Sequence, residues 1–321
     1  MTKTARAHTN IALIKYWGKK DATLRIPLMS SLSMTLDAFY TDTSIEKAKD
    51  SSEFYLNGKK QSITDSQRVF NYIKMLQHKF NLEEENLVIK SINHVPTSAG
   101  LASSSSAFAA LAAAFCAYYN IDADKTLLSR LARIGSGSAS RSIFGGFSIW
   151  QKGDSDESSY AYALDEDPKM DLQLLAVELD TKQKKISSTR GMKDAQSSPF
   201  FKPWIARNEL ELNKMIEAIK NNDFTALGEL AELNANEMHA INLTAQPEFT
   251  YFEPDTIRAI KLIENLREHG IECYYTIDAG PNIKVLCQLR NRKEIIENFE
   301  SEFNNVNIVS ASFGPGVTYL D

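Results

Sequence analysis

Alternating apolar and polar residues mark short stretches of this chain, and elsewhere apolar residues recur at spacings of three and four. An alternating stretch at 86–92 predicts a strand, which runs into a loop of small residues at 97–106. The uncharged, alanine-rich stretch 107–119 predicts a helix that is buried on most sides. A second helix is expected at 124–134, and a strand at 144–150.

The acidic, serine-rich segment 153–159 predicts an exposed loop, and beyond it the pattern changes in a way that indicates a second module. Ala279–Asn282 is a turn-forming tetrapeptide that favours a hairpin between the strands on either side of it. The order of elements resembles a split β-α-β layout, with helices covering one face of an antiparallel sheet. The elements expected in this module are strands at 172–179, 273–278, 283–289 and 306–313 and helices at 201–221, 223–242, 255–269 and 293–303.

With 321 residues, 43% of them hydrophobic and 24% charged, the chain can bury one large core or two medium ones. Its longest apolar run, Phe108–Tyr118, is much shorter than the roughly 20 residues that span a membrane. Residues 1–6 carry two positive charges, but no apolar stretch and cleavage site follow them. We therefore expect a cytoplasmic protein that neither crosses a membrane nor carries a secretory signal.

The positions of the cysteines and histidines and the net charge of the chain limit which metals, disulfides and partners are expected. Cys116, Cys273 and Cys287 stand singly among apolar residues, which favours buried free thiols over disulfides or a zinc site. The five histidines are dispersed without metal-binding spacing, so any metal must arrive with a ligand. A formal net charge of −5 disfavours nucleic acid as a partner. An anionic ligand would need cations that are gathered locally.

The clearest local signal is the segment Pro96–Ser106, between a predicted strand and the start of a predicted helix. Phosphates bind at such places, because unpaired N–H groups and the positive end of the helix dipole face the ligand. The hydroxyls of Ser103 and Ser104 offer further hydrogen bonds or a ligand for Mg²⁺. The alternative is a serine-rich linker with a capping serine. The segment has neither the Walker A nor the dinucleotide-binding spacing.

Lys15 and Lys19 are four residues apart, with Tyr16 and Trp17 between them. They share a face if the segment is helical, and they bracket one concave site if it is an extended strand leading into a loop. A solvated basic pair is the alternative. Bulky aromatic residues beside the lysines favour a packed pocket with a cationic rim.

Arg141 and Asp278 are the other candidates for chemistry. The planar guanidinium of Arg141 can hold a carboxylate with two hydrogen bonds, and Ser136 and Ser138 supply neutral donors beside it. An exposed arginine after a helix is the alternative. Asp278 ends an apolar strand and opens a turn, so its carboxylate is either a turn-capping acceptor or a catalytic group.

The pattern Pro-x-x-x-Gly-Leu-x-Ser-Ser resembles the ATP-binding loop of the galactokinase, homoserine kinase, mevalonate kinase and phosphomevalonate kinase superfamily. Segments 10–19, 136–142 and 276–282 resemble motifs of one branch, the diphosphomevalonate decarboxylases. Ala102 is typical of that branch, since the kinases usually have a second glycine there. Ser98, where relatives often have alanine, is a small departure. The resemblance runs in order from about residue 10 to residue 316.

The resemblance implies an assignment for each part of the site. Lys15, Arg141 and Asp278 correspond to the catalytic centre, and Arg190 is a further anion-binding candidate without a matched counterpart. The substrate-binding residues implied are Tyr16, Trp17, Gly18, Lys19 and Arg68 for the diphosphate, together with Ser136, Gly137, Ser138, Ala139, Ser140, Ser142, Ser187 and Ser188. The residues implied for ATP are Pro96, Ser98, Ala99, Gly100, Leu101, Ala102, Ser103 and Ser104, the last two also as ligands of Mg²⁺.

The resemblance also implies an activity and a fold. The activity is conversion of mevalonate diphosphate, with ATP and Mg²⁺, to isopentenyl diphosphate, carbon dioxide, ADP and phosphate, a step of isoprenoid biosynthesis. The fold is α+β, with a ribosomal-protein-S5-like domain at 1–180, a ferredoxin-like domain at 181–321, and a cleft between them. A homodimer is expected. The alternatives are a kinase of the same superfamily that stops after phosphorylation, and an inactive anion-binding module.

Overall fold

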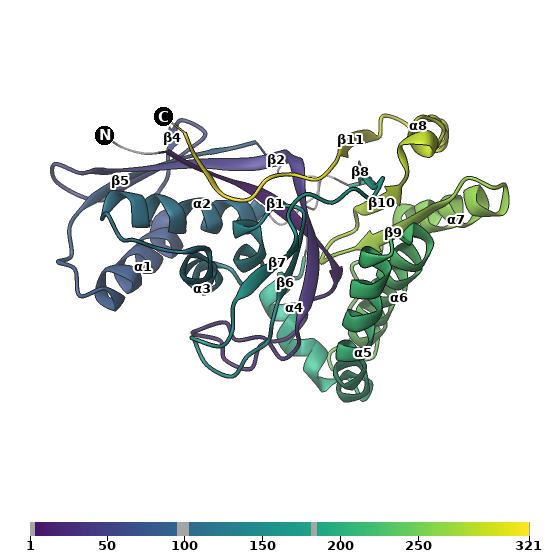
Figure 1. The fold of residues 1–321 in the computed structure, drawn as a ribbon, viewed down its shortest axis with the longest axis horizontal. Helices are drawn as coiled ribbons and strands as arrows, with labels where there is room; N and C mark the ends of the chain where they lie inside the picture. Colours follow the sequence, from purple (N-terminus) through teal and green to yellow (C-terminus); the bar gives the residue numbers. More distant parts are fainter. Residues whose placement is uncertain (1–3, 95–102, 181–184, 321) are drawn as a thin grey trace.

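The computed structural model describes residues 4–94, 103–180 and 185–320, which form two sheets with helices packed against them (Figure 1). The larger sheet has eight strands, in the order β12-β1-β2-β5-β3-β4, with β6 and β7 branching from β2. These strands are β1 Thr4–Ile14, β2 Ser31–Lys47, β3 Glu53–Leu56, β4 Lys59–Lys60, β5 Leu87–Asn93, β6 Phe147–Trp150, β7 Ala161–Asp165 and β12 Thr318–Leu320.

The long strand β2 organises this sheet. One side of β2 pairs with β1, while on its other side Thr41–Lys47 pairs with β5 and Ser31–Met34 pairs with β6. Strand β12 pairs with β1, so the end of the chain returns to the first sheet after passing through the second (Figure 1). Strand β1 therefore has a paired strand on each side, and the segment that follows it leaves the sheet from a fixed place.

Three helices cover one face of the large sheet (Figure 1): α1 Ile63–Lys79, α2 Ser103–Tyr118 and α3 Lys125–Gly135. The alanine-rich α2 is buried as predicted, since its small side chains allow close packing against β1, β2 and α3. It begins at Ser103, however, whereas the sequence predicted a loop as far as Ser106. The serine hydroxyls bond locally and to the sheet, as between Ser106 and Thr41 at 2.8 Å, so they can be buried within a helix.

The second sheet is antiparallel, with the order β11-β8-β10-β9. This order, with helices after the first and third of its strands in sequence, is that of a β-α-β-β-α-β fold. Its strands are β8 Gln173–Glu178, β9 Cys273–Ile277, β10 Ile283–Cys287 and β11 Asn307–Ala311. The helices of this part are α4 Ser188–Asp194, α5 Phe201–Lys220, α6 Phe224–Leu243, α7 Pro254–Glu268 and α8 Leu289–Glu302.

The mixed α+β, two-part architecture is confirmed, and each strand and long helix predicted beyond residue 170 is present. One expectation was wrong, because helices lie on both faces of the second sheet. Leu175 and Val177 pack with α7 and α8, whereas Leu174 and Ala176 pack with α5, α6 and the large sheet. A strand with an unbroken run of buried apolar residues has no solvent face, and that pattern indicates cover on both sides.

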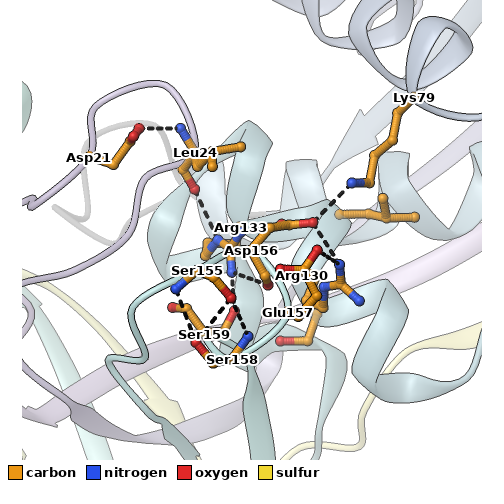
Figure 2. A network of polar contacts seen from close by, with 12 residues as sticks. Asp21, Leu24, Lys79, Arg130, Arg133, Ser155, Asp156, Glu157, Ser158 and Ser159 are labelled. Carbon is orange, nitrogen blue, oxygen red and sulfur yellow. Dashed lines mark hydrogen bonds and ion pairs between the residues drawn. The ribbon is translucent and has the colours of Figure 1, made fainter.

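The segment 153–159 is not simply an exposed loop. Asp156 is only 8% exposed and Ser159 is fully buried. Figure 2 shows why, since Asp156 accepts hydrogen bonds from Lys79, Arg130 and the fully buried Arg133. A carboxylate with three cationic partners can be buried where an unpaired one could not. The serine-rich composition gave no sign of these partners.

The cysteines are free and buried, as predicted. Within the described ranges, no group of three or more histidine, cysteine, aspartate or glutamate residues is arranged to hold a metal ion. Among the helices of the same ranges, none combines the length and apolar character needed to cross a membrane.

Candidate active site

A cavity of about 520 Å³ lies where the two parts of the chain meet. The first part contributes the end of β1 with the segment after it, and the short 3₁₀ helix η1, Gly137–Ile143, which follows α3. The second part contributes the start of α4, one residue of α6 and the end of β9. Its lining includes Asn10, Ala12, Lys15, Tyr16, Trp17, Lys19, Arg25, Arg68, Ser104, Ser136, Gly137, Ser138, Arg141, Ser187, Ser188, Thr189, Met192, Met238, Asp278 and Ala279.

Lys15 and Asp278 form an ion pair in this cavity. Lys15 directly follows β1, and its ammonium donates to Asp278 Oδ1 at 2.7 Å and to the carbonyl of Ala12 at 2.8 Å. Its backbone N–H donates to Asn234 Oδ1 at 2.7 Å. The Lys15 side chain is 1% exposed and that of Asp278 is 25% exposed, so the carboxylate is the more accessible member of the pair.

The charges of this pair depend on one another. Burial raises the cost of ionising Asp278, but Lys15, Lys284 and Arg141 outweigh that cost and lower its pKa. Burial lowers the pKa of Lys15, although Asp278 opposes the shift. Asp278 is therefore a carboxylate at neutral pH. Its side chain bonds to Lys15, and the turn after β9 is closed by backbone groups, from Gly280 N–H to the Asp278 carbonyl at 2.9 Å.

Arg141 is 2% exposed and projects from η1 into the same cavity. Its guanidinium donates to Ser31 Oγ at 2.5 Å and to Asn10 Oδ1 at 3.1 and 3.3 Å. No carboxylate within the described part of the chain forms an ion pair with it, and burial lowers its pKa to about 10, so it remains charged. A buried guanidinium that has only neutral partners and spare N–H groups suits an anionic ligand.

Tyr16 packs tightly against η1. A Cβ atom added at Gly137 would lie 2.8 Å from the Tyr16 ring, so only glycine allows this approach. The Tyr16 hydroxyl is buried without a hydrogen-bond partner among the described residues, and burial raises its pKa. Trp17 donates from Nε1 to Asn242 Oδ1 at 2.8 Å. The unsatisfied hydroxyl is a donor available to a ligand.

The start of α4 forms the opposite wall. Ser187 caps this helix by accepting from the N–H of Arg190 at 3.3 Å, while Ser188 and Thr189 also line the cavity. Arg190 points elsewhere, since its side chain is 66% exposed and pairs with Asp194 at 3.2 Å. The structure thus brings Ser187 and Ser188 to the cavity and leaves Arg190 outside it.

Several predicted site residues support the cavity without lining it. Ala139, Ser140 and Ser142 are buried inside η1, where the Ser142 hydroxyl accepts from Asn10 at 2.8 Å. Gly18 has a φ of +152° and lies in the segment between the lining residues Trp17 and Lys19. Pro96, Ser98, Ala99, Gly100, Leu101 and Ala102 lie outside the described residues.

A smaller hollow of about 230 Å³ lies beside the first. It is lined by Ser103 and Ser104 at the start of α2, with Phe54 and Val69 among its apolar residues. Ser104 and Arg68 line both hollows, and the Ser104 hydroxyl lies 3.2 Å from that of Ser136. Two ligands could therefore meet at Ser104.

Sequence reasoning missed seven lining residues, namely Asn10, Ala12, Arg25, Thr189, Met192, Met238 and Ala279. Asn10, Ala12 and Ala279 stand within the motif segments 10–19 and 276–282, and Thr189 and Met192 lie close in sequence to the predicted residues Ser187, Ser188 and Arg190, so their positions were the available signal. Arg25 and Met238 carry no local signal. They reach the cavity only through contacts between distant segments.

Fold and cavity together define a class of protein: a two-part α+β protein whose cavity is lined by a carboxylate and several cationic side chains. A diphosphomevalonate decarboxylase-like N-terminal domain model matches residues 7–161, and a mevalonate 5-diphosphate decarboxylase C-terminal domain model matches residues 174–315. The chain belongs to the diphosphomevalonate decarboxylase family.

Individual relatives agree with this membership. The chain is similar to the diphosphomevalonate decarboxylase of Ganoderma lucidum, with 35% identity over 92% of this chain and 80% of that protein. The human enzyme is 33% identical over 87% of this chain and 75% of its own length. A crystal structure of mevalonate diphosphate decarboxylase from Staphylococcus aureus has a TM-score of 0.95 and 41% identity, covering 100% of this chain and 98% of that one.

Two further solved structures bear on ligands. One, described as MDDEF in complex with MVAPP, AMPPCP and magnesium, has a TM-score of 0.93 and 41% identity, covering 100% of this chain and 99% of that one. Another describes ATP binding mediated by mevalonate diphosphate in the Enterococcus faecalis decarboxylase, with a TM-score of 0.92 and 41% identity, again over 100% and 99% of the two chains.

Proposed function

We propose that this protein catalyses the ATP-dependent decarboxylation of mevalonate diphosphate to isopentenyl diphosphate, carbon dioxide, ADP and phosphate. The observation that carries the proposal is the content of one cavity, in which a carboxylate, a buried guanidinium and a group of cations face each other. The substrate has a carboxylate at one end and a diphosphate at the other, with the reacting C3 hydroxyl between them. Each of these groups has a complementary residue in the cavity.

Arg141 binds the substrate carboxylate in this proposal. Its bonds to Asn10 and Ser31 fix the plane of the guanidinium before the substrate arrives. A fixed fork with two spare N–H groups holds a carboxylate in one orientation, aligned with the C–O bond that breaks at C3. The diphosphate lies at the other end, against Tyr16–Lys19 and Arg68, with Ser136, Ser138, Ser187 and Ser188 adding neutral donors.

Asp278 faces the C3 hydroxyl while that group is phosphorylated. A lowered pKa makes Asp278 a weak base, so its main contribution is to orient the hydroxyl and to stabilise the positive charge that develops at C3 when phosphate leaves. Lys15 keeps Asp278 ionised and offsets negative charge as the phosphoryl group moves. The bond between the carboxylate carbon and its neighbour then supplies the electrons, and carbon dioxide departs.

In this proposal ATP, with Mg²⁺, binds at the second hollow. Its apolar residues suit a nucleoside, and Ser103 and Ser104 stand at the first turn of α2, where phosphates are stabilised. Their hydroxyls are the candidate protein ligands for an Mg²⁺ ion carried by the ATP phosphates. Bound Mg²⁺ supplies neutralisation of phosphate charge during transfer. The contact between Ser104 and Ser136 supports a meeting of the two substrates at this point.

The remaining expectations belong to the same proposal. The chain divides near residue 180 into domains 1–180 and 181–321, with β8 of the first contributing a strand to the sheet of the second. The protein acts in the cytoplasm, as a homodimer.

Incubation with ATP, Mg²⁺ and mevalonate diphosphate tests the activity. We expect carbon dioxide, ADP, phosphate and isopentenyl diphosphate in equal amounts. A stable phosphorylated product without carbon dioxide would instead identify a kinase of the same superfamily, and the absence of ATP turnover would identify an inactive anion-binding module. Mevalonate phosphate serves as the matched control substrate, because it differs only by the terminal phosphate.

A further inference from the structure

Three cations gather at one end of the cavity, and one of them, Arg25, belongs to no motif. Lys19, Arg25 and Arg68 all line the cavity, and none of them forms an ion pair with the described residues. Burial lowers the pKa of all three side chains, and Arg25 adds to the shift in both Lys19 and Arg68. Like charges held together without a counterion cost free energy, which an anionic ligand with several charges would recover.

The backbone of Arg25 indicates that its position serves more than packing. Its φ is +53°, in the left-handed region that most side chains avoid. The other non-glycine residues with positive φ in the described ranges are Asn57, Asn81, Asn120, Asn222 and Asn305, all asparagine, the residue that tolerates this conformation best. A side chain held in an unfavourable backbone conformation is more often found at functional sites than elsewhere.

A buried network holds Arg25 in this conformation. The carbonyl of the preceding residue, Leu24, accepts from Arg133 Nε at 2.9 Å, and the Leu24 N–H donates to Asp21 at 2.7 Å (Figure 2). Arg133 is itself fixed by Asp156, inside the network of Lys79 and Arg130 described above. The loop that carries Arg25 is therefore anchored to α3 and to the segment 153–159.

The side chain of Arg25 points to the end of α3. One of its terminal nitrogens donates to the carbonyl of Ile134, and Arg68 Nη2 donates to the neighbouring carbonyl of Gly135 at 3.0 Å. These bonds alone would make Arg25 a helix cap. A guanidinium has five N–H donors, however, and no other hydrogen bond from Arg25 to a described residue is present, so most of them remain for a ligand.

We propose that Arg25 is a substrate-binding residue that, with Lys19 and Arg68, binds the diphosphate and makes the site prefer a diphosphate over a monophosphate. The inference rests on the proposed function for the identity of the substrate, but the anion it assigns is defined by charge and geometry. A diphosphate carries more negative charge than a monophosphate and has two groups of oxygens. Three converging cations match it better than they match a single phosphate.

The test compares Arg25→Met with Lys20→Met in the full chain. Methionine keeps an apolar stem without the charge, and Lys20 lies on the same segment, but its ammonium is half-exposed and pairs with Asp154 at 2.6 Å outside the cavity. We expect Arg25→Met to raise KM for mevalonate diphosphate about 10- to 100-fold, because the variant loses one or two charge-assisted hydrogen bonds to the substrate. The values of kcat and of KM for ATP should stay within about 3-fold of the wild type. Lys20→Met should behave as the wild type.

Calorimetric titration with inorganic pyrophosphate and inorganic phosphate separates this inference from the proposed function. We expect Arg25→Met to lose most of the preference for pyrophosphate, and Arg25→Lys to restore part of it. That result supports the inference even if the wild type releases no carbon dioxide. A lowered Tm with unchanged KM and unchanged pyrophosphate binding would identify Arg25 as a helix cap only and would overturn it.

Discussion

Lys15 and Asp278 are separated by 263 residues in the chain, yet the Lys15 ammonium donates to the Asp278 carboxylate at 2.7 Å. Lys15 follows the first strand of the large sheet, and Asp278 follows β9 of the second. The pair therefore exists only when both parts of the chain are folded against each other. Since Asp278 is the more exposed partner, it can contact a substrate without breaking its bond to Lys15.

Replacing Asp278 with asparagine should nearly abolish turnover. Asparagine keeps the shape of the turn, which is closed by backbone groups, but it removes the charge that faces C3. We expect kcat to fall by more than the roughly 10²- to 10⁴-fold of general-base catalysis alone, with KM for both substrates almost unchanged. Steady-state kinetics on the folded variant measures this.

The same variant should also lose stability, because Lys15 is 1% exposed and would keep a buried charge without its partner. Urea denaturation measures that loss. Asp167→Asn is the control, since Asp167 is an exposed aspartate whose one ion pair with a described residue is to the exposed Lys169. A folded Asp278→Asn enzyme with more than about a tenth of normal turnover would remove Asp278 from the reaction, since this corresponds to only about 1.4 kcal/mol of barrier.

Arg141→Lys should be severely impaired although the charge is kept. The guanidinium divides its bonds between Asn10 and Ser31 and still has N–H groups for a ligand, and a single ammonium cannot reproduce these directions. We expect kcat/KM for mevalonate diphosphate to fall by at least about 100-fold, equivalent to two charge-assisted bonds. ATP binding, measured separately by titration, should be retained.

Arg190→Lys makes a suitable comparison, because Arg190 is an exposed arginine outside the cavity. Both variants lose a guanidinium and keep a positive charge. If Arg141→Lys turned over substrate as well as Arg190→Lys does, Arg141 would not be the residue that holds the carboxylate.

Local patterns in the sequence predicted most of the fold but not the long-range contacts. The alternation at 86–92 and the apolar runs near 173–178 and 273–277 give strands in the structure because their neighbours cover the predicted faces. The pattern for 15–19 fitted either a helix or an extended segment, and the extended alternative is the one found. Burial of this segment against α6 decides this, through the bonds from Lys15 to Asn234 and from Trp17 to Asn242, and these partners lie more than a hundred positions away.

The residues of the candidate site could also be predicted only in part. Lys15, Arg141 and Asp278 stand in recognisable motifs, so the sequence could single them out. Arg25 and Asp156 do not stand in such motifs. Arg25 gains its role from its place in the cavity, and Asp156 gains its role from three cations on two helices. The sequence of an acidic loop is the same whether its carboxylates are solvated or paired with distant cations. The sequence around a basic residue likewise does not show whether that residue is solvated or lines a cavity.

Asp156→Asn should destabilise the protein strongly. The change leaves Arg133, which is fully buried, without its carboxylate. Breaking a buried pair in this way costs about 3–5 kcal/mol. Urea denaturation should show this loss, whereas Asp154→Asn on the same segment, whose carboxylate is 89% exposed, should show no measurable change. Equal stability of the two variants would mean that the network in Figure 2 contributes nothing.

The carboxyl group of Glu237, which lies near the groups that support Lys15, should make stability depend on pH. Glu211 on α5 and Glu237 on α6 both contact Arg207, at 3.1 and 2.8 Å. Glu211 also accepts from Asn234 at 2.6 Å, and Asn234 in turn accepts from the backbone N–H of Lys15. Burial, and then the neighbouring Glu211, raise the pKa of Glu237 from 4.5 to about 7, although Arg207 opposes the shift.

Because the pKa of Glu237 is raised in the folded protein, the direction in which stability changes with pH is determined. Between pH 4.5 and about 7 the folded protein retains a proton on Glu237 that the unfolded chain has released, so the free energy of unfolding falls as pH rises through this window. Glutamine imitates the protonated carboxyl, and Glu237→Gln should therefore match the wild type near pH 4.5 and exceed its stability at pH 8. Urea denaturation at several pH values measures both curves, with Glu229→Gln, an exposed position on α6, as the control. If the wild type kept constant stability across the window, or if Glu237→Gln kept the wild-type slope, Glu237 would not hold the proton.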